Sequence, residues 1–254
     1  EVPGQLPWDN TQAFAIYDPN QNNGGFIGTF LDMARAGSVR ELRDVFLENG
    51  GVPWNHTLAT DSTGETFYAD TPFVPFLAPP VEGAFLQAVA GDPALAGAFE
   101  QGLVILDGSV SVAMPVEVPG FPVPGAIPFD RAPQTFRDDF VMNSNDSFWL
   151  PNPNERLEAI SRLYGDPGTE PRSFRTRMGL TQLGELTPGQ VTAQTLQELL
   201  FANRSFTAEL WQEAICNGDV TAVSASDGEV QDLTQACGII ANWDGRLNRE
   251  SVGA

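Results

Sequence analysis

With 254 residues, of which 42% are hydrophobic and 18% charged, the chain has the composition of a globular protein with a sizeable core, which excludes a disordered polypeptide. Its 33 acidic residues outnumber 13 basic residues, all of them arginine, and the formal net charge of −20 disfavours nucleic acid as a partner. No apolar run approaches the length of a membrane-spanning helix, so no membrane partner is expected, and the lack of an initiator methionine or signal-like segment at Glu1 indicates a processed or trimmed end.

The first part of the chain, residues 13–77, has the pattern of a strand, two helices and a hairpin. The expected elements are a strand at 14–17, helices at 26–36 and from Ser38 to before Gly50, and a hairpin of the runs 54–61 and 66–70. Ser38 and Glu41 have the spacing of a capping box, in which the two side chains satisfy backbone N–H groups at the start of the second helix.

His56 is the only histidine, and it lies within the expected hairpin. A Ser-His-Asp or Cys-His site would need serine or cysteine partners to converge on it, and no spacing in the sequence indicates that they do. We therefore expect His56 to be a surface residue or a hydrogen-bonded strand residue.

Residues 78–137 are the least regular part of the chain, and we interpret them as a variable insertion. Weak helical patterns at 84–89 and 94–99 and an apolar, strand-like run at 103–106 precede a proline- and valine-rich segment at 110–128, which suits extended edges and turns. Such insertions vary freely on a scaffold, so no chemistry is assigned to them.

The stretch 137–150 is the most informative, because it changes abruptly from apolar to polar. The apolar run 140–142 predicts a strand, after which Asn143 and Asn145 would point to the same face. Asparagine is depleted in strands because its amide competes for backbone hydrogen bonds, so two on one face need a reason. Either the amides satisfy a neighbouring loop at a strand end, or one amide NH2 donates into a pocket and stabilises a developing oxyanion.

The remainder, within the segment 138–254, is expected to be mainly helical. Two helical patterns cover 155–164 and 206–216. Two more begin at caps, one at Thr195 and Glu198 and the other at a capping box of Ser226 and Glu229. Arg172, Arg175 and Arg177 form a cluster that is conspicuous in a chain so short of positive charge, although such clusters commonly form a solvated helix face.

Two cysteines, Cys216 and Cys237, flank a polar, turn-rich segment, and each lies late in a helical pattern. A disulfide closing this loop would contribute about 3 kcal/mol and would indicate an oxidising compartment; two free thiols are the alternative. Asp138, Asp139 and Asp146 could bind Ca²⁺, but no ligand loop is recognisable. No phosphate-binding glycine loop, Cys-x-x-Cys pair or His-Glu-x-x-His motif occurs, so neither a metal nor a cofactor is predicted.

Several segments together resemble the penicillin acylase and acyl-homoserine-lactone acylase family of N-terminal-nucleophile hydrolases, over about 13–77 and 138–243. The motifs are Val-Pro-Trp-Asn-x-Thr-Leu-Ala-x-Asp-x-x-Gly-x-x-x-Tyr at 52–68, Phe-Val-x-Asn-Ser-Asn-Asp-Ser-x-Trp-Leu at 140–150 and Pro-Arg-Ser-x-Arg-Thr-Arg-Met-Gly-Leu at 171–180. Each motif is moderately specific by itself, and their combination is more so.

The resemblance implies an α+β fold that is part of an N-terminal-nucleophile hydrolase αββα sandwich with a helical C-terminal portion, in one domain over 1–254. It implies that Asn145 donates to the oxyanion and that Arg172 lies beside the nucleophile, where it holds this asparagine and the free amine. Related acylases have a cysteine pair flanking the same turn, so the resemblance favours a disulfide between Cys216 and Cys237 and a periplasmic or extracellular location.

The family's nucleophile, most often a serine at the first residue of the β-chain whose own amine acts as the base, has no counterpart at Glu1. The resemblance therefore implies a later part of an acylase β-chain, inactive alone, with a companion chain or segment bearing the nucleophile. The expected substrates are small acyl amides such as a penicillin, an acyl-homoserine lactone or a lipopeptide. The alternative hypothesis is a non-catalytic acidic extracellular domain with a structural or ligand-binding role.

Overall fold

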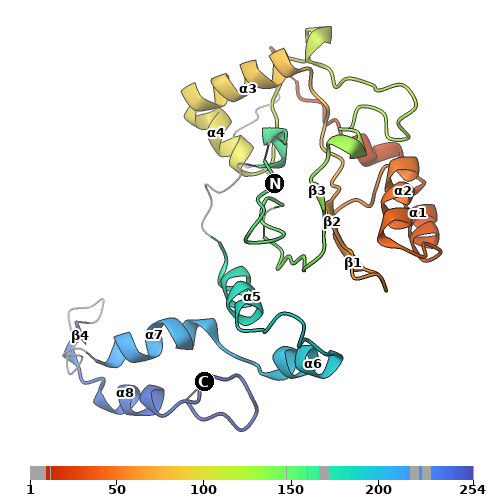
Figure 1. Cartoon of the computed structure of the whole chain (residues 1–254). Coiled ribbons are helices and arrows are strands. Elements are labelled where there is room, and N and C mark those ends of the chain that lie inside the picture. The colour runs from red at the N-terminus through yellow and green to blue at the C-terminus, as the bar shows by residue number, and fades with distance from the viewer. Residues whose placement is uncertain are drawn as a thin grey trace. The chain divides into compact units, whose positions relative to one another are not determined.

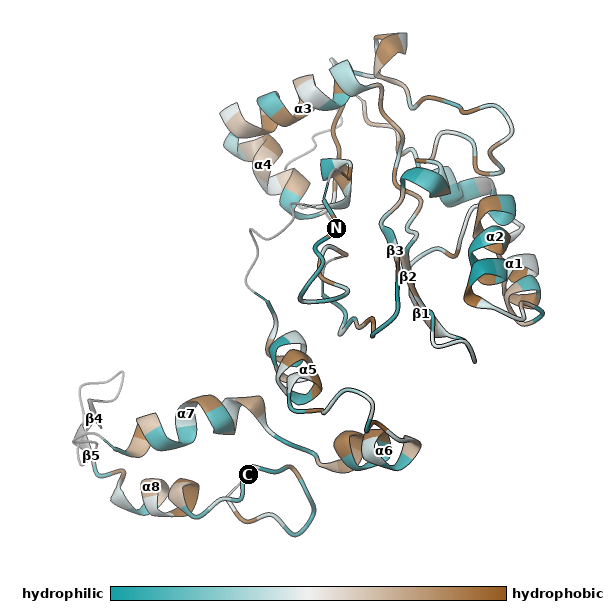
Figure 2. Ribbon diagram, in the orientation of Figure 1, coloured by the Kyte–Doolittle hydropathy of each residue, from teal (hydrophilic) through white to brown (hydrophobic). Residues whose placement is uncertain are grey.

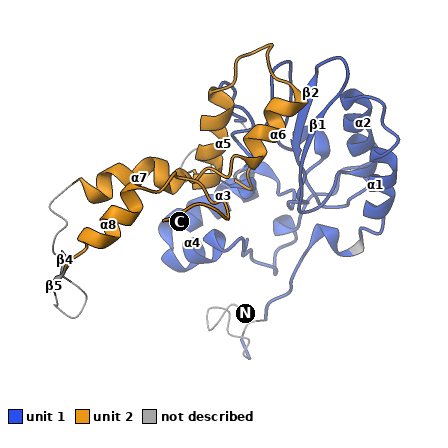
Figure 3. Cartoon of the chain, turned by 90° about the horizontal axis from the view of Figure 1, so that it is seen from below, with its two compact units in different colours: residues 1–143, 147–170 blue, residues 144–146, 171–254 orange. Residues whose placement is uncertain are grey.

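The computed structural model describes residues 10–11, 13–146, 148–158, 160–165, 172–217, 223–224 and 230–253, and the chain forms two compact units (Figures 1 and 3). Unit 1 comprises residues 1–143 and 147–170, and unit 2 comprises residues 144–146 and 171–254. The chain therefore crosses between the units on either side of residues 144–146, and Asn145 belongs to unit 2.

The helices and strands of each unit are as follows. Unit 1 contains η1 (Pro19–Asn22), α1 (Phe26–Met33), α2 (Val39–Asn49), β1 (His56–Thr60), β2 (Thr66–Asp70), α3 (Pro79–Gly91), α4 (Pro93–Glu100), η2 (Ser111–Ala113), η3 (Phe129–Arg131), β3 (Gln134–Arg137) and η4 (Arg162–Tyr164). Unit 2 contains α5 (Phe174–Gly184), α6 (Ala193–Phe201), α7 (Phe206–Cys216), β4 (Val223–Ser224), β5 (Val230–Gln231) and α8 (Thr234–Ala241). This mixture of helices and small antiparallel sheets is compatible with the predicted α+β class. Within the described ranges, no helix is both long and apolar enough to cross a bilayer.

The predicted hairpin is confirmed by the pairing of β1 with β2, and β3 extends the sheet on the other side of β2. Asp61 shapes the hairpin turn, because its Oδ1 accepts a hydrogen bond from the N–H of Thr63 at 2.9 Å. Its Oδ2 accepts another from the N–H of Val39, the first residue of α2, at 3.1 Å. The turn is thus tied to the start of the helix that packs on the sheet.

The helix α2 begins at the predicted cap. The Ser38 hydroxyl accepts a hydrogen bond from the N–H of Glu41 at 3.1 Å. The reciprocal half of the capping box is absent, because the Glu41 carboxylate accepts from the N–H of Gly37 at 2.7 Å. At the other end, Gly50 adopts a left-handed conformation with φ of 89° and closes the helix, as predicted.

The sheet has an apolar face and a polar face. The apolar face contributes to the core of unit 1, whose buried members are Val39, Leu42, Phe46, Val52, Phe67, Ala69, Phe129 and Ala132. Figure 1 shows α1 and α2 together on one side of the sheet. Because side chains alternate along a strand, Tyr68 and Asp70 of β2 point to the opposite face. That second face, rather than the core, holds the polar groups described below.

The predicted strand at 140–142 is wrong. The strand β3 ends at Arg137, and the Asp139 carboxylate then accepts a hydrogen bond from the N–H of Phe140 at 2.6 Å, which favours a turn over continued pairing. Asn145 has a φ of 60°, in the left-handed region that no strand accommodates. Asn143 and Asn145 therefore do not share one face of a strand, contrary to the prediction.

The predicted helix at 155–164 is also wrong, because in the described part only the short η4 is helical. The N–H groups of Glu155 and Leu157 instead bond to the carbonyls of Asn152 and Trp149, at 3.2 and 2.9 Å. Neither 14–17 nor 103–106 forms a strand, whereas α3 and α4 contain the weak helical patterns at 84–89 and 94–99.

In unit 2, α7 has the predicted bounds, and α6 begins at Ala193 with Thr192, rather than Thr195, as its N-cap. The Thr192 hydroxyl accepts a hydrogen bond from the N–H of Thr195 at 3.1 Å. The capping box predicted at Ser226 and Glu229 lies outside the described residues. Figure 2 shows hydrophobic positions in brown along α6 and α7. Several large hydrophobic side chains of these helices are exposed, namely Leu196, Leu200, Phe201, Trp211 and Ile215.

We predict that the junction after α2 tolerates no side chain at Gly51. With a φ of 104°, a Cβ there would lie 2.7 Å from the Cβ of Thr71, whose hydroxyl bonds both the N–H and the carbonyl of Val52. The Gly51→Ala variant should therefore lower the free energy of unfolding by roughly 2–4 kcal/mol.

Gly64 is the matched control, because its φ is 88° but no atom would lie within 4 Å of an added Cβ. The Gly64→Ala variant should lose only about 1 kcal/mol from the left-handed backbone. Chemical denaturation of both variants measures the difference, and equal losses would show that the contact with Thr71 is unimportant.

Candidate functional site

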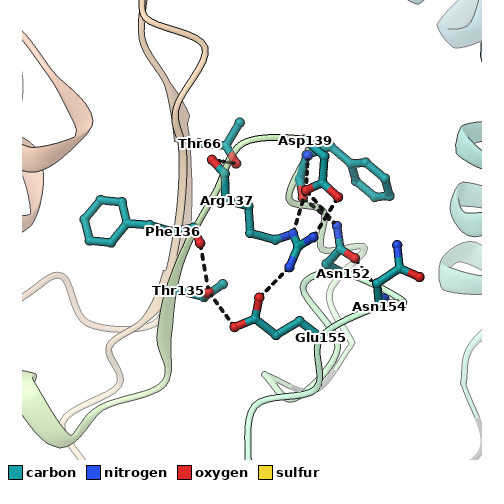
Figure 4. A network of polar contacts seen from close by, with 9 residues as sticks. Thr66, Thr135, Phe136, Arg137, Asp139, Asn152, Asn154 and Glu155 are labelled. Atoms are coloured by element: carbon teal, nitrogen blue, oxygen red, sulfur yellow. Dashed lines mark hydrogen bonds and ion pairs between the residues drawn. The ribbon is translucent and has the colours of Figure 1, made fainter. Parts of the chain in front are cut away.

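The loop that follows β3 is closed at its base by Arg137 (Figure 4). The guanidinium donates to both oxygens of Asp139, from Nε at 2.5 Å and from Nη2 at 2.7 Å, and its Nη1 donates to Glu155. The other oxygen of Glu155 accepts from the hydroxyl of Thr135, on β3, at 3.1 Å. A planar guanidinium with several donors suits such a bidentate arrangement, so one side chain joins the start of the loop to its end.

Asn152 adds a second connection across the loop, and it is fully buried. Its Nδ2 donates to the carbonyl of Phe140 at 2.8 Å and to Asp139 at 3.2 Å. One step further along, the N–H of Met142 donates to the carbonyl of Pro151 at 2.8 Å. Hydrogen bonds thus connect the two limbs of the loop, the one leaving β3 and the one returning through Asn152, as far as Met142, the residue before Asn143.

The polar face of the sheet holds His56, Tyr68 and Asp70. Strand pairing places His56 opposite Asp70, and the His56 Nδ1 lies 2.9 Å from the Tyr68 hydroxyl and 3.5 Å from the Asp70 carboxylate. The Asn143 side chain also hydrogen-bonds to Tyr68. His56 is therefore a hydrogen-bonded strand residue, as predicted, but its partners were not foreseen. The signal was present in the hairpin register, which pairs the only histidine with an acidic residue.

Burial alters the protonation of this cluster. It raises the pKa of the Asp70 carboxyl to about 7 and lowers the pKa of the His56 imidazole, because a poorly solvated site disfavours both charged forms. Burial raises the pKa values of Tyr68 and Tyr164, and the negative charge of the Asp70 carboxylate raises them further by a smaller amount. Both phenols are therefore neutral donors throughout the ordinary pH range.

Residues 144–146 are held within unit 2 by the start of α5. The carbonyl oxygen of the Asn145 side chain accepts a hydrogen bond from Arg175 Nη1 at 3.1 Å. The Asp146 carboxylate accepts another from the N–H of Ser173 at 2.9 Å, and Ser173 is the N-cap of α5. An acidic side chain is favoured at this end of a helix, where N–H groups are unsatisfied and the dipole is positive.

The predicted arginine cluster divides into different environments. Arg172 is exposed and directly precedes the cap of α5, so its assigned role beside a nucleophile stays a prediction. Arg175 contacts Asn145 and was not singled out from the sequence, where only its membership of the cluster could have indicated it. The guanidinium of Arg177 lies over the rings of Phe174 and Phe206, 5.7 and 4.9 Å from their centroids.

Cys216 and Cys237 are free thiols in this structure, and each is partly buried. They are close enough to form a hydrogen bond, which together with desolvation raises the pKa of the Cys216 thiol to about 11. The two helices α7 and α8 therefore bring the predicted pair together, while the disulfide itself stays a prediction. Among the described side chains, no group of three or more histidines, cysteines or acidic residues is arranged to hold a metal ion.

An open hollow of about 460 Å³ lies beside the hairpin turn in unit 1. It is lined by Arg40, Thr63, Gly64, Glu65, Phe136, Arg137 and Asp138. Arg40 pairs with Glu65 and stacks 3.8 Å above the ring centroid of Phe136. Because the lining carries the Arg40–Glu65 ion pair, Arg137 and Asp138 while apolar lining is scarce, this hollow does not suit an acyl chain.

Comparison with known proteins gives a consistent result. The sequence profile described as "Penicillin amidase" matches residues 5–254. The chain is 36% identical to aculeacin-A acylase of Actinoplanes utahensis, over 100% of this chain and 33% of that protein. It is 33% identical to acyl-homoserine lactone acylase PvdQ of Pseudomonas savastanoi pv. phaseolicola, over 98% of this chain and 30% of that protein. The chain thus spans about a third of the length of the curated relatives it matches.

We predict that Asp70 makes stability depend on pH. Because its pKa is about 7 in the folded chain and near 3.8 when unfolded, its contribution is complete below pH 3.8 and is lost as pH rises to 7. His56 has the opposite sign, since a lowered pKa weakens the folded state as pH falls. The stability of the Asp70→Asn variant relative to the parent should therefore rise by roughly 3 kcal/mol between pH 5 and pH 8, out of about 4 kcal/mol over the whole titration.

Urea denaturation at several pH values measures this difference. The exposed neighbour of the Arg137 clamp, Asp138, provides the control. Asp138→Asn removes one exposed carboxylate and leaves the His56, Tyr68 and Asp70 cluster intact, so it accounts for the change in net charge. If the stability difference between Asp70→Asn and the parent stays constant with pH, the raised pKa of Asp70 is contradicted.

Proposed function

Because this chain belongs to the penicillin amidase family, we propose that it is part of an amide-hydrolysing acylase in which another segment or a companion chain bears an N-terminal serine nucleophile. The names of the matched relatives support the reaction class, since both are acylases. The share of their length that the chain matches supports a division of labour with further polypeptide. In this proposal the sheet β1-β2-β3 is part of an αββα sandwich, and the chain alone hydrolyses no amide.

The proposal depends on one observation, the hydrogen bond between Arg175 and the side chain of Asn145. A guanidinium has donors only, so it can bond only to the carbonyl end of the carboxamide. This fixes the orientation of the amide and puts its NH2 at the other end, away from Arg175. Withdrawal of electron density toward the cation also makes that NH2 a better donor.

The chemistry of acyl transfer gives this NH2 a task. When a serine oxygen bonds to the carbonyl carbon of an amide, the π electrons of the carbonyl move to its oxygen, which becomes an anion. A fixed donor aimed at that oxygen lowers the barrier, because it is oriented before the charge develops. We assign Asn145 as this donor. A backbone N–H of the nucleophile-bearing segment would complete the site.

The start of α5 supports this assignment electrostatically. In a chain with a net charge of −20, Arg172 and Arg175 bring two positive charges to the residues flanking the α5 cap. The bond from Ser173 to Asp146 fixes the residue after Asn145 at the same helix end. We propose that Arg172 stabilises the nucleophile's amine and Asn145 from this position.

Small acyl amides are the proposed substrate class, and penicillins, acyl-homoserine lactones and lipopeptides are the members to be tested. Aculeacin-A acylase and PvdQ differ in the substrates that their names state, so the family does not determine the acyl group. We also propose a periplasmic or extracellular location with a disulfide between Cys216 and Cys237, which the proximity of the two thiols supports.

The central prediction concerns Asn145 in the assembled acylase. Asn145→Ala should lower kcat by about 10²–10³-fold while folding is retained, because one oxyanion donor is lost. Steady-state kinetics on an acyl-amide panel measures this. The exposed Asn154→Ala is the matched asparagine control and should retain normal turnover. Near-normal turnover of Asn145→Ala would reject the oxyanion role.

Arg175 and Arg172 are each expected to affect turnover in the assembled acylase, in different ways. Arg175→Ala should lower kcat roughly tenfold, because it frees the Asn145 amide to rotate without removing it. Arg172→Ala should lower kcat and also change the pH dependence of kcat/KM, because it would act on the amine that serves as the base. Unchanged kinetics in either variant would remove that arginine from the site.

A further inference from the structure

The Tyr68 hydroxyl is held by the sheet and cannot readily move. Tyr68 is fully buried at the centre of β2, paired with β1 on one side and β3 on the other. Its ring lies nearly parallel to that of His56, with centroids 5.9 Å apart and an interplanar angle of 19°. The 2.9 Å contact with His56 Nδ1 fixes the hydroxyl from one side. The phenol oxygen is thus a rigid point on the polar face.

The hydrogen bonds through this oxygen have a direction. The bond from Asn143 lowers the pKa of Tyr68, against the stronger effect of burial, as expected when the asparagine NH2 donates to the phenol oxygen. Because Tyr68 keeps its proton, its O–H can donate onward to His56. Burial favours the neutral imidazole, which can accept at Nδ1. The resulting order of donation is Asn143 to Tyr68 to His56.

Asn143 occupies a particular place in the chain. It is the residue at which the chain leaves unit 1, directly before residues 144–146 of unit 2. Hydrogen bonds across the loop hold Phe140 and Met142, so the side chain of Asn143 is the next attachment along the same limb. Two residues later comes Asn145, which adopts a strained left-handed conformation.

We propose that Tyr68 is a positioning residue for the acylase reaction, which holds Asn143 so that the backbone two residues later presents the Asn145 amide correctly. This inference rests on the proposed function of Asn145. Neither His56 nor Tyr68 is proposed to touch the reacting atoms. Their task is to make Asn143 a fixed point, because small displacements of a catalytic donor reduce the rate strongly.

The alternative is that the cluster only stabilises the fold, as satisfied buried polar groups commonly do. A structural role predicts that loss of the Tyr68 hydroxyl lowers stability and the amount of folded enzyme. A positioning role predicts a lower kcat per folded molecule with KM little changed, because the donor acts mainly in the transition state. The two roles therefore differ in a measurable way.

The experiment uses the assembled acylase with an acyl-amide substrate that the parent enzyme hydrolyses. Tyr68→Phe removes the hydroxyl and keeps the ring, and Asn143→Ala removes the other partner of the same bond. Each should lower kcat per folded molecule roughly 10- to 100-fold with KM within about twofold. The double variant should lose little more than the more affected single variant, because both changes break one connection.

Tyr164→Phe is the matched control. It also removes a phenol hydroxyl near Asp70, but Tyr164 is not the partner of Asn143. It should leave kcat per folded molecule within about twofold of the parent. Circular dichroism and titration of competent nucleophile give the folded fraction for every variant. If Tyr68→Phe does not fold, the comparison of kcat per folded molecule between Asn143→Ala and the control Tyr164→Phe still provides the test.

The Asn145→Ala variant distinguishes failure of the positioning role of Tyr68 from failure of the proposed function of Asn145. If Asn145→Ala is nearly inactive while Tyr68→Phe and Asn143→Ala have normal kcat, the positioning role is overturned and the oxyanion role stands. Additive losses in the double variant would also overturn it. If Asn145→Ala has normal turnover, the proposed function itself fails.

Discussion

The closure of the loop after β3 by Arg137 is the interaction on which the arrangement of the candidate site depends. Its side chain is only 15% exposed and binds carboxylates from both limbs of the loop. Its hydrogen bonds hold the pKa of Asp139 at about 2, so that carboxylate is charged over the whole ordinary pH range. Without the arginine, Asp139 and Glu155 would be left as neighbouring like charges. The clamp is thus the condition for this acidic loop to fold back on the sheet.

A second set of hydrogen bonds holds the loop beyond the ion pairs of Arg137. Beyond Met142 two uncharged carboxamides bind the chain to its surroundings, Asn143 through the neutral Tyr68 hydroxyl and Asn145 through the guanidinium of Arg175. Burial raises the pKa of Asp70 and lowers that of His56, which keeps this part of unit 1 poor in net charge near neutral pH. The ion pairs of Arg137 close the base of the loop, and the carboxamides beyond Met142 are oriented by hydrogen bonds, because the two ends of an amide differ in donor and acceptor character.

The local fold was largely predictable where the sequence contains its own start and stop signals. Ser38 caps α2, Gly50 ends it, and the alternating runs after it form the hairpin. The loop after β3 was not predictable, because its conformation depends on contacts between residues far apart in sequence. The apolar pattern at 140–142 suits a strand, but pairing of Arg137 with Glu155, 18 residues later, bends the chain instead.

The site was predictable in its residue types and less so in its partners. The motif around Asn145 pointed to a carboxamide, and a cluster of three arginines in so acidic a chain pointed to α5. Which arginine contacts the amide depends on rotation around the helix start, and the structure selects Arg175. The hairpin register could have paired His56 with Asp70, but no pattern along the chain indicates that Asn143 returns to bond with Tyr68.

The use of an amide, rather than an arginine, as the proposed anion donor follows from the same charge balance. The chain has 33 acidic and 13 basic residues, so a guanidinium placed at the reaction centre would compete for neighbouring carboxylates. Arg137 and Arg204 show this outcome, since both are held by two acidic side chains. A carboxamide has no net charge to attract them. With Arg175 bound to its carbonyl, the amide of Asn145 is polarised by the cation, while the NH2 proposed as the anion donor carries no net charge.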